Sequence, residues 1–459
     1  MRADHPLLQY GETFLAQQPL KLVKGIVGGY VAYPIAHHME RRSVTAKVAE
    51  LRNHYKLPFS QRRALAFERL RDILRFAGAE VPYYRDLFRA LSFDPDRVND
   101  VRQLEEIPYL TKDIIREQGN RLLSRPLEGV RHHACKTGGS TGLSCTIFYD
   151  QPAADHSSAV TYFARQAIGK RRHRSELHFA CRFPNDPIPQ WPSREDFKCF
   201  AMNRTNIFFD RIDDVGLEEI WTTLKRRKPY LVHAHPSTIH ALAAYVQRRY
   251  GGGKAFAVFE SSGELLEAKA RELIASALRC RVVDRYGLAE LGVMAYELNG
   301  SGAGLQVLES EGWPESRPVS DNPDGAHELV FTGFRNKLMP LIRYATGDLA
   351  TVEERPDAFV LTNVTGRIHD VVPINGVDYP THHIQDILDH RVGGIQEFQI
   401  DLRTTPPTLR LVLEPWANPD ETRQKLRTFW PSGFDVAFVG HEDFVRVGSR
   451  AKFRHVVTA

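Results

Sequence analysis

The glycine-rich loop from which the fold can be inferred reads Lys136-Thr137-Gly138-Gly139-Ser140-Thr141-Gly142. Its three glycines allow positive φ and let the backbone approach a ligand closely. Its three hydroxyl side chains add donors beside the backbone N–H groups, which suits the β- and γ-phosphates of ATP without a P-loop lysine. An apolar segment, residues 146–149, predicts a strand that anchors one end of the loop. Because Gly/Ser/Thr runs are often plain turns, this signal needs support from the rest of the chain.

Around this loop, short apolar runs alternate with amphipathic segments. Strands are expected at residues 146–149, 230–232 and 255–259, and helices at residues 217–225, 237–248 and 265–278. Strands that alternate with helices predict an α/β architecture with a largely parallel sheet. Upstream, residues 61–90 predict a helix that gives way to a loop at Val81-Pro82-Tyr83-Tyr84.

The pattern changes after about residue 370. Residues 398–402 and 409–413 predict paired strands around the turn 404–407, followed by a helix near 421–429 and a strand at 435–439. Together they predict a small α+β unit of about 90 residues. We therefore expect two domains, residues 1–368 with a helical extension at 1–60, and residues 369–459.

Composition narrows the class of protein. The 459 residues are 42% hydrophobic and 25% charged, which is typical of a globular chain with a large core. The 61 basic and 56 acidic residues are too evenly matched to indicate nucleic acid as a partner. Five scattered cysteines without a C-x-x-C pair favour a reducing compartment, so a cytoplasmic location is expected. A zinc site formed by His178, Cys181 and Cys199 is the weaker alternative, because its spacing is unusual.

The N-terminal region is apolar in part but shows no signal peptide. Its most apolar stretch, residues 25–36, contains Pro34 and is too short to span a bilayer, which takes about 20 residues. A segment docked on the protein surface is favoured over an interfacial helix on a membrane. Two basic clusters, residues 170–174 and 225–228, are expected to be solvated helix ends, with contact to a phosphate-bearing acceptor as the alternative.

Five further motifs follow the loop in order. They are Ser261-Ser262-Gly263-Glu264, Tyr286-Gly287-Leu288-Ala289-Glu290, Ile342-Arg343-Tyr344-Ala345-Thr346-Gly347-Asp348, Gly366-Arg367-Ile368-His369-Asp370 and Ser449-Arg450-Ala451-Lys452. This ordered set resembles the adenylate-forming superfamily of acyl-CoA synthetases, adenylation domains and luciferases, and within it the phenylacetate–CoA ligase family with its capsule-biosynthesis relatives. Residues 81–85, 107–112 and 235–237 also look like that family, and the likeness covers about residues 60–456.

The resemblance implies a nucleotide site built from these motifs. The loop Thr137 to Gly142 would hold the ATP phosphates, and Ser262, Gly263 and Glu264 would line the adenine pocket. Tyr286, followed by Gly287, would stack on the purine, a contact worth about 1–3 kcal/mol. Asp348 would accept hydrogen bonds from the ribose hydroxyls, and Arg367 would reach the ribose or the α-phosphate.

It also implies two catalytic residues, Glu290 and Lys452. Glu290 would bind Mg²⁺, a hard cation that takes oxygen ligands. Lys452 would stabilise the charge on the transferring phosphoryl group, and it is one of only two lysines after residue 370, the other being Lys425 in a predicted helix. The C-terminal domain would be a mobile lid that swings about His369, where the family has an acid or a lysine. Four alternatives stay open: Tyr286 as ordinary core, Asp348 as a turn residue, Glu290 paired with Arg285, and Lys452 as a surface lysine.

The implied function is that of an AMP-forming ligase, which makes an acyl-adenylate from ATP and a small carboxylic acid and then an acyl-CoA thioester. An aryl or other apolar acid is favoured by the candidate pocket residues Phe179, Phe200, Phe208, Phe209, Trp191, His233 and His235. The alternatives are an amide ligase or adenylyltransferase of natural-product or polysaccharide biosynthesis, and a non-catalytic nucleotide-binding relative. Gly138 and Leu143-Ser144, which depart from the family's phosphate loop, motivate the last. A homodimer is a weak expectation.

Overall fold

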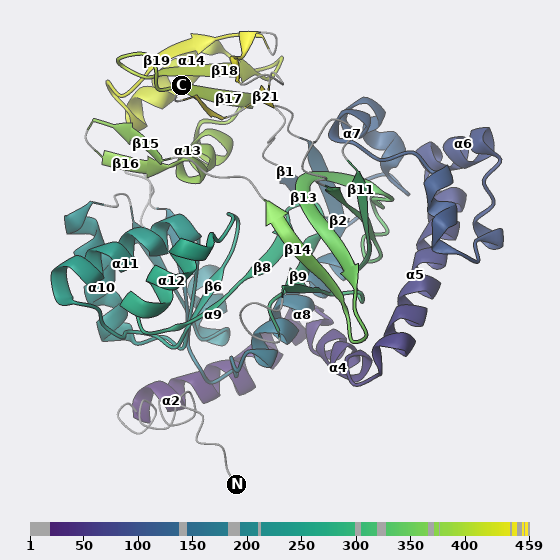
Figure 1. The fold of residues 1–459 in the computed structure, drawn as a ribbon, viewed down its shortest axis with the longest axis horizontal. Helices are drawn as coiled ribbons and strands as arrows, with labels where there is room; N and C mark the ends of the chain where they lie inside the picture. The colour runs from purple at the N-terminus through teal and green to yellow at the C-terminus, as the bar shows by residue number, and fades with distance from the viewer. Residues whose placement is uncertain are drawn as a thin grey trace.

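The computed structural model describes residues 19–136, 145–181, 193–209, 213–298, 304–318, 327–365, 371–375, 377–440, 443–447, 452–453 and 455–457 (Figure 1). The predicted α/β class is confirmed. Two large sheets, one parallel and one antiparallel, make up most of the structure, and elements of the C-terminal region lie at one end of the molecule.

The parallel sheet has the strand order β4-β3-β5-β6-β7. Its strands are β3 (Glu176–Cys181), β4 (Arg204–Phe209), β5 (Leu231–Ala234), β6 (Val258–Ser261) and β7 (Arg281–Val283). Helices α10 (Asp214–Arg227), α11 (Pro236–Tyr250) and α12 (Ala268–Ala277) share one apolar core with the sheet, and α8 (Gln151–Ala167) shares another. Because helices cover both faces, strands such as β6 are buried throughout.

The second sheet contains seven strands in the order β11-β12-β13-β14-β10-β9-β8. They are β8 (Arg285–Leu288), β9 (Gly292–Tyr296), β10 (Leu305–Val307), β11 (Gly312–Pro318), β12 (His327–Gly333), β13 (Tyr344–Glu354) and β14 (Phe359–Thr365). All of its pairings are antiparallel. Of these two large sheets, the expectation of a largely parallel sheet was therefore right only for residues 176–283, because no helix among the described residues lies between β8 and β14 to make a parallel crossover.

The N-terminal part of the described chain is helical. It comprises α2 (Pro19–Ile26), the π-helix η1 (Val27–Ala32), α3 (Tyr33–Met39), α4 (Val44–His54), α5 (Phe59–Glu80), α6 (Pro82–Leu91) and α7 (Lys112–Gln118). Short 3₁₀ segments lie at η2 (Pro95–Arg97), η3 (Val101–Glu106) and η4 (Gly119–Leu122). The predicted loop at 81–84 was wrong: Pro82 occupies the first turn of α6, where its missing N–H costs no helical hydrogen bond.

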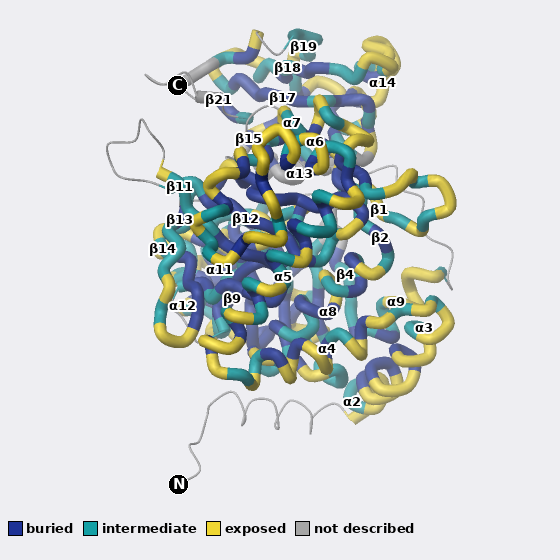
Figure 2. The backbone as a smooth tube through the Cα atoms, turned by 90° about the vertical axis from the view of Figure 1, so that its right-hand side faces the viewer, coloured by how far each residue is buried: buried dark blue, intermediate teal, exposed yellow. Residues whose placement is uncertain are grey.

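A hairpin and one further helix complete this part of the chain. Strands β1 (His132–Lys136) and β2 (Thr146–Asp150) pair with each other, and α9 (Arg194–Ala201) contacts η1 and α3. Figure 2 shows the buried backbone concentrated in the sheets, whereas α2, α3 and α9 lie at the margin with much of their surface exposed. Among the described residues, we find no helix both long and apolar enough to cross a membrane.

The C-terminal region contains a small α+β arrangement, with the predicted strand pair, helix and final strand in place. The elements are β15 (Val371–Ile374), β16 (Val377–Pro380), α13 (Thr381–Ile387), the π-helix η5 (Leu388–Val392), β17 (Ile395–Asp401), β18 (Thr408–Leu413), α14 (Pro419–Phe429), β19 (Asp435–Phe438), β20 (Arg446–Val447), β21 (Lys452–Phe453) and β22 (Val456–Val457). Its four-stranded sheet has the order β19-β18-β17-β22. One hydrophobic cluster contains only residues between Val372 and Val456. Since a separate core is what defines a domain, we propose that a second domain begins near residue 369.

Candidate active site

The predicted phosphate loop, Thr137 to Gly142, lies outside the described residues, but both of its ends are placed. Lys136 of β1 pairs with Thr146 of β2, so the loop connects the two strands of a hairpin rather than being anchored at one end only. Burial raises the pKa of the Cys135 thiol, a hydrogen bond with Tyr149 lowers it in part, and the negative charge of Glu290 raises it. The hairpin therefore lies near Glu290.

Glu290 is buried and faces a hydroxyl and an ammonium group. Its Oε1 accepts a hydrogen bond from the Tyr344 hydroxyl at 2.7 Å, and the Lys112 Nζ lies 3.6 Å from the same oxygen. The side chains of Lys112 and Glu290 are 8% and 5% exposed. The alternative in which Glu290 pairs with Arg285 is wrong, because Arg285 lies near Glu260 instead.

Lys112 reaches Glu290 because the segment before α7 forms a parallel bridge, from Leu110 to Tyr344, with the start of β13. The Leu110 N–H donates to the Arg343 carbonyl at 2.9 Å, and the Ala345 N–H donates back to the Leu110 carbonyl at 3.0 Å. This brings the first turn of α7, where Lys112 lies, beside Tyr344. Both residues lie in sequence motifs, but no role could be predicted for either, since nothing in their spacing indicates that these motifs meet.

Tyr286 and Asp348 are 62 residues apart in sequence and are joined by a hydrogen bond. The Tyr286 hydroxyl donates to the Asp348 Oδ2 at 2.7 Å. Three strands separate β8 from β13 in the sheet order, so this contact forms because the sheet curls and brings its two parts together. Asp348 lies within β13 and is buried, so its alternative as a turn residue is wrong.

Tyr286 is part of the main hydrophobic core, as its alternative supposed. It is 9% exposed, and its ring centroid lies 6.3 Å from that of Phe331. Burial raises the pKa of the Tyr286 hydroxyl well above its usual value, and the charge of Asp348 raises it further. The hydroxyl is therefore a permanent donor to Asp348, and the stack of this ring on a purine stays a prediction.

The residues predicted to line the adenine pocket, Ser262 to Glu264, follow β6 and connect the parallel sheet to α11. We call them the predicted adenine segment. Glu264 accepts hydrogen bonds from the Ser237 N–H at 2.9 Å and the Ser237 hydroxyl at 3.0 Å, which places its carboxylate at the N-terminus of α11. Gly263 has φ +83°, and a Cβ there would lie 2.4 Å from the His235 ring. Ser262 accepts a hydrogen bond from the Arg285 guanidinium at 2.7 Å.

Of the predicted positions, Lys452 is placed only in part, and Arg367 and His369 are not placed. The backbone of Lys452 forms β21, where its partner is Val447 of β20, but its side chain is outside the described residues. Arg367 and the hinge residue His369 are also outside them. Gly287 lies on β8, close to the backbone of Gly292 and Val293, so a side chain would crowd the neighbouring strand. The roles of these residues stay predictions.

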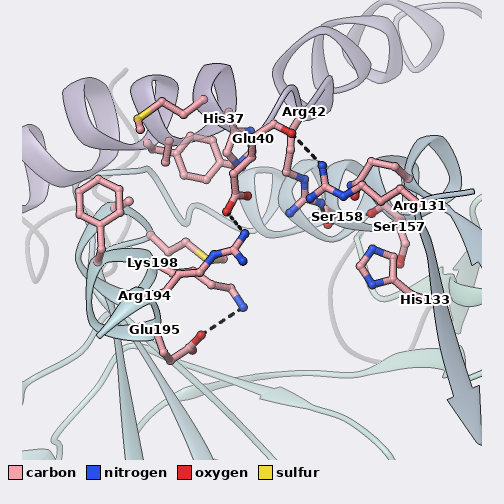
Figure 3. Close-up of a pocket in the computed structure, with 18 of the residues that line it drawn as sticks. His37, Glu40, Arg42, Arg131, His133, Ser157, Ser158, Arg194, Glu195 and Lys198 are labelled. Atoms are coloured by element: carbon pink, nitrogen blue, oxygen red, sulfur yellow. Dashed lines mark hydrogen bonds and ion pairs between the residues drawn. The ribbon is translucent and has the colours of Figure 1, made fainter. Parts of the chain in front are cut away.

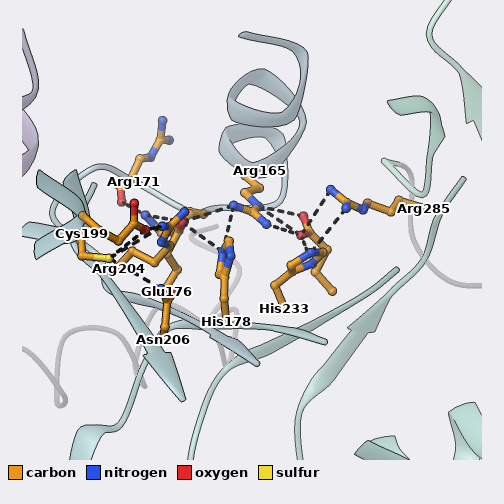
Figure 4. A network of polar contacts seen from close by, with 12 residues as sticks. Arg165, Arg171, Glu176, His178, Cys199, Arg204, Asn206, His233 and Arg285 are labelled. Carbon is orange, nitrogen blue, oxygen red and sulfur yellow. Dashed lines mark hydrogen bonds and ion pairs between the residues drawn. The ribbon is translucent and has the colours of Figure 1, made fainter. Parts of the chain in front are cut away.

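A buried network of charges lies beside the adenine segment, between α8 and the parallel sheet (Figure 4). The Arg165 guanidinium lies 2.6 Å from Glu260 and 3.3 Å from Glu176. His178 and Lys170 lie 3.2 Å from the Glu176 carboxylate. The network comprises Arg165, Lys170, Glu176, His178, His233, Glu260, Arg285 and Tyr296.

The two carboxylates of the network are held ionised. Burial alone would raise the pKa of Glu260, but Arg165, Arg285 and His233 hold it well below its usual value. Lys170 and Arg165 do the same for the pKa of Glu176. Burial lowers the pKa of His233 to about 3, so its imidazole is neutral. A glutamate inside the apolar run of β6 was the available signal for this network, since buried carboxylates are usually paired.

Arg285 connects the network to the candidate site. It contacts Glu260 of β6 and Ser262, and the next residue in β8 is Tyr286. The network therefore fixes the adenine segment and the start of β8 relative to each other.

A separate cavity of about 1080 Å³ opens between α3, α9, α8 and the β1–β2 hairpin (Figure 3). Its polar lining includes His37, Glu40, Arg42, Arg131, His133, Ser157, Ser158, Arg194, Glu195 and Lys198. None of the predicted site residues that the structure describes is in its lining.

The aromatic candidates for an acid pocket are dispersed. Phe200 packs against Ala32 and Tyr33 of the N-terminal helices, and Phe179 packs against the core of α10 to α12. The side chains of Trp191, Phe208 and Phe209 are outside the described residues. No group of three potential metal ligands occurs among the described residues, and Cys199, of the alternative zinc set, contacts Arg204 and Asn206.

Comparison with known proteins gives the same family as the sequence motifs. No family model matches. The phenylacetate–coenzyme A ligase of Escherichia coli (strain K12) is 26% identical over 341 residues, which cover 71% of this chain and 76% of that protein. The corresponding ligase of Pseudomonas putida is 26% identical over 75% of this chain and 77% of its own. Protein CapK of Staphylococcus aureus is 23% identical over 62% of each.

Solved structures show the same fold. A 2-hydroxyisobutyryl-CoA ligase, in complex with its acyl-AMP and CoA, superposes with a TM-score of 0.54 at 19% identity, covering 87% of this chain and 90% of its own. An open conformation of that ligase gives a TM-score of 0.52. The chain is therefore a relative of the phenylacetate–coenzyme A ligases and has the fold of the adenylate-forming ligases.

Proposed function

We propose that the chain is an AMP-forming ligase that activates a carboxylic acid with ATP and passes the acyl group to coenzyme A. The observation that carries this proposal is the convergence of separate motifs, in which Tyr286 bonds Asp348 while Glu290 meets Tyr344 and Lys112. The relatives named as phenylacetate–coenzyme A ligases support the reaction.

The nucleotide would lie between the loop 137–142 and the Tyr286–Asp348 pair. Ser262, Gly263 and Glu264 would border the adenine, and Arg367 would reach the ribose or the α-phosphate. Because Tyr286 donates to one oxygen of Asp348, it orients this carboxylate toward the ribose hydroxyls. Groups oriented before binding add affinity because they lose little freedom when the ligand arrives.

Glu290 is the residue we propose as the Mg²⁺ ligand. Both of its contacts, to Tyr344 and Lys112, are made by Oε1, which leaves Oε2 as the proposed metal-binding oxygen. When bound at Glu290, Mg²⁺ would offset the negative charge of the phosphate groups. Lys112, beside this carboxylate, adds positive charge at the same place.

Lys452 is the proposed catalytic cation for attack of the carboxylate on the α-phosphorus. Negative charge grows on the transferring phosphoryl oxygens in this step, and a positioned ammonium lowers its barrier. We propose that the C-terminal domain carries Lys452 as a lid that turns near His369.

For the acid, the relatives favour an aryl substrate. The solved 2-hydroxyisobutyryl-CoA ligase makes a small hydroxy acid the second class to test. We further propose that the enzyme works in the reducing cytoplasm, since its five cysteines are scattered and form no C-x-x-C pair, and that it forms a homodimer.

The proposal is tested by ATP–pyrophosphate exchange with a panel of aryl, small hydroxy, fatty and amino acids. Exchange that depends on one acid class, followed by mass-spectrometric detection of its CoA thioester, is the expected result. An amide formed only with an amine acceptor would instead identify an amide ligase. ATP binding without exchange across the panel would identify a non-catalytic relative.

A further inference from the structure

Helices α2, η1 and α3 present a continuous apolar face to solvent. We call it the apolar stripe, and its members are between 42% and 85% exposed: Leu20, Val23, Ile26, Val27, Tyr30, Val31, Ile35 and Met39. Their spacing of three and four residues places them along one side of the helical segment. Figure 2 shows α2 and α3 at the edge of the molecule.

The stripe is exceptional within the described part of the chain. The described residues include thirteen exposed large hydrophobic side chains, and eight of them lie between Leu20 and Met39. The other five lie elsewhere in the sequence: Leu91, Phe197, Val215, Tyr250 and Trp416. Single exposed apolar residues are normal on a protein surface, whereas a contiguous group marks an interaction site.

Glycines on the opposite side of the segment fix which face points outward. A Cβ at Gly25 would lie 2.3 Å from the His173 carbonyl oxygen, and one at Gly28 would lie 2.3 Å from that of Phe200. One at Gly29 would lie 2.7 Å from Arg172. A side chain larger than that of glycine would clash at these three positions. The helical segment therefore cannot rotate to bury the apolar stripe against the protein. Each mid-helix glycine costs about 1 kcal/mol of helix stability, so the close packing has to offset that cost.

Basic residues surround the stripe. Lys21 donates to the Lys228 carbonyl at 2.7 Å, and the Tyr30 hydroxyl lies 3.5 Å from the His173 Nδ1. These contacts bring residues 170–174 and 225–228 against the helical segment. Together with residues 19–43, these segments contain twelve Lys and Arg and one acid, Glu40. Two of the twelve do not add to the exposed charge, because Lys170 is buried beside Glu176 and Arg42 pairs with Asp155. The pKa of Lys21 is lowered to about 8, mainly by burial of its ammonium group and then by the positive charges of Arg227, Lys228 and Lys24.

Of the three acids near the C-terminal end of the stripe, Glu40 and Glu195 have basic partners and Asp196 takes part in the capping box of α9. Glu40 pairs with Arg194 at 2.5 Å. Glu195 lies 3.4 Å from Lys198 and also pairs with Arg204. Asp196 caps α9 by accepting from the Ser193 N–H and hydroxyl. The surface around the stripe is therefore positive.

We infer that this face docks on the surface of an anionic lipid membrane, with the apolar stripe in the interfacial layer and the basic residues against the headgroups. An apolar helical face bordered by Lys and Arg is the arrangement that binds such surfaces. A second copy of the chain fits less well, because a two-fold contact through the stripe sets the same basic segments against each other. The inference concerns a surface apart from the candidate active site and is tested without ligase activity.

Sedimentation with lipid vesicles tests it on the full chain. Vesicles of phosphatidylglycerol mixed with phosphatidylcholine are expected to carry the protein down, and vesicles of phosphatidylcholine alone to carry much less. The variants Val27→Glu and Ile35→Glu are expected to lower the partition coefficient on the order of tenfold each. Lys24→Glu and Arg226→Glu are expected to lower it about fivefold each on the anionic vesicles only.

Val215→Glu and Trp416→Glu are matched controls, because both residues are exposed and apolar but lie outside the stripe. They are expected to sediment like the unmodified chain, and circular dichroism confirms that each variant is folded. A protein that stays in solution with both kinds of vesicle overturns the inference. So do stripe variants that bind as before, or that only convert a dimer to a monomer.

Discussion

The hydroxyl of Tyr286 is one of the single groups on which the candidate site depends, because it holds Asp348 in place across the curled sheet. Tyr286→Phe keeps the ring and removes this donor. We expect the free energy of unfolding to fall by about 1–2 kcal/mol, since a buried carboxylate loses a hydrogen bond, and the KM for ATP to rise. Urea unfolding and steady-state kinetics measure both. Tyr245→Phe, which removes a donor to Glu218 on α10, is the control and leaves the KM for ATP unchanged.

Lys452 is the second residue with a sharp expectation. If its ammonium acts only on the transferring phosphoryl group, Lys452→Ala reduces acyl-AMP formation by about a hundredfold or more and leaves ATP binding largely intact. Pyrophosphate release and calorimetric ATP titration separate the two effects. Lys425→Ala is the matched control in the same region, where Lys425 donates to the Val392 carbonyl at 3.2 Å. Normal pyrophosphate release from Lys452→Ala refutes the assignment.

At the scale of elements, the turn that leads from β6 toward α12 depends on Gly263. Alanine at position 263 would have a positive φ, and its Cβ would also clash with His235. Alanine at position 251 would have a positive φ too, but no atom lies within 4 Å of its Cβ. We expect Gly251→Ala to cost about 1 kcal/mol of stability and Gly263→Ala about 2–4 kcal/mol. Only Gly263→Ala is expected to weaken ATP binding as well. Equal losses in urea unfolding and unchanged ATP affinity contradict this role.

The local sequence pattern predicted some helices and strands well and missed others. Helices α10 to α12 and strands β5 and β6 could be predicted, because each has its own apolar period and its own turn residues. The seven-stranded antiparallel sheet was missed, since its strands differ in length from three to eleven residues and are separated by no helix. The start of α6 was missed because a proline that ends one helix also begins the next.

The whole molecule carries partly buried histidines that make its stability depend on pH. Burial lowers the pKa of His156 to about 3, and the cations Arg335, Lys47 and Arg69 lower it further against the opposing effect of Asp155. The unfolded chain binds a proton below about pH 6.5 and the folded chain does not, so stability is full above that pH and is lost as the pH falls. His37 and His233 act in the same direction.

We expect the free energy of unfolding to fall between pH 7.5 and pH 5, and His156→Gln to reduce this fall by at most about 1–2 kcal/mol. Urea unfolding at the two pH values measures it. Glu176 and Glu260, whose pKa values are also lowered, change the free energy of unfolding only at a pH below this window. A fall of the same size in His156→Gln shows that this imidazole does not contribute.

The sequence by itself determined the α/β class, the C-terminal α+β unit and the order of the motifs, because these depend on local periods and on residue types at short spacing. It named Tyr286, Glu290 and Asp348 without indicating that Tyr286 bonds Asp348 or that Glu290 pairs with Lys112 rather than with Arg285. Only the tertiary structure decided these partners. The curl of one sheet and the bridge from Leu110 to Tyr344 of β13 bring together groups that lie far apart along the chain, and no local pattern encodes such contacts.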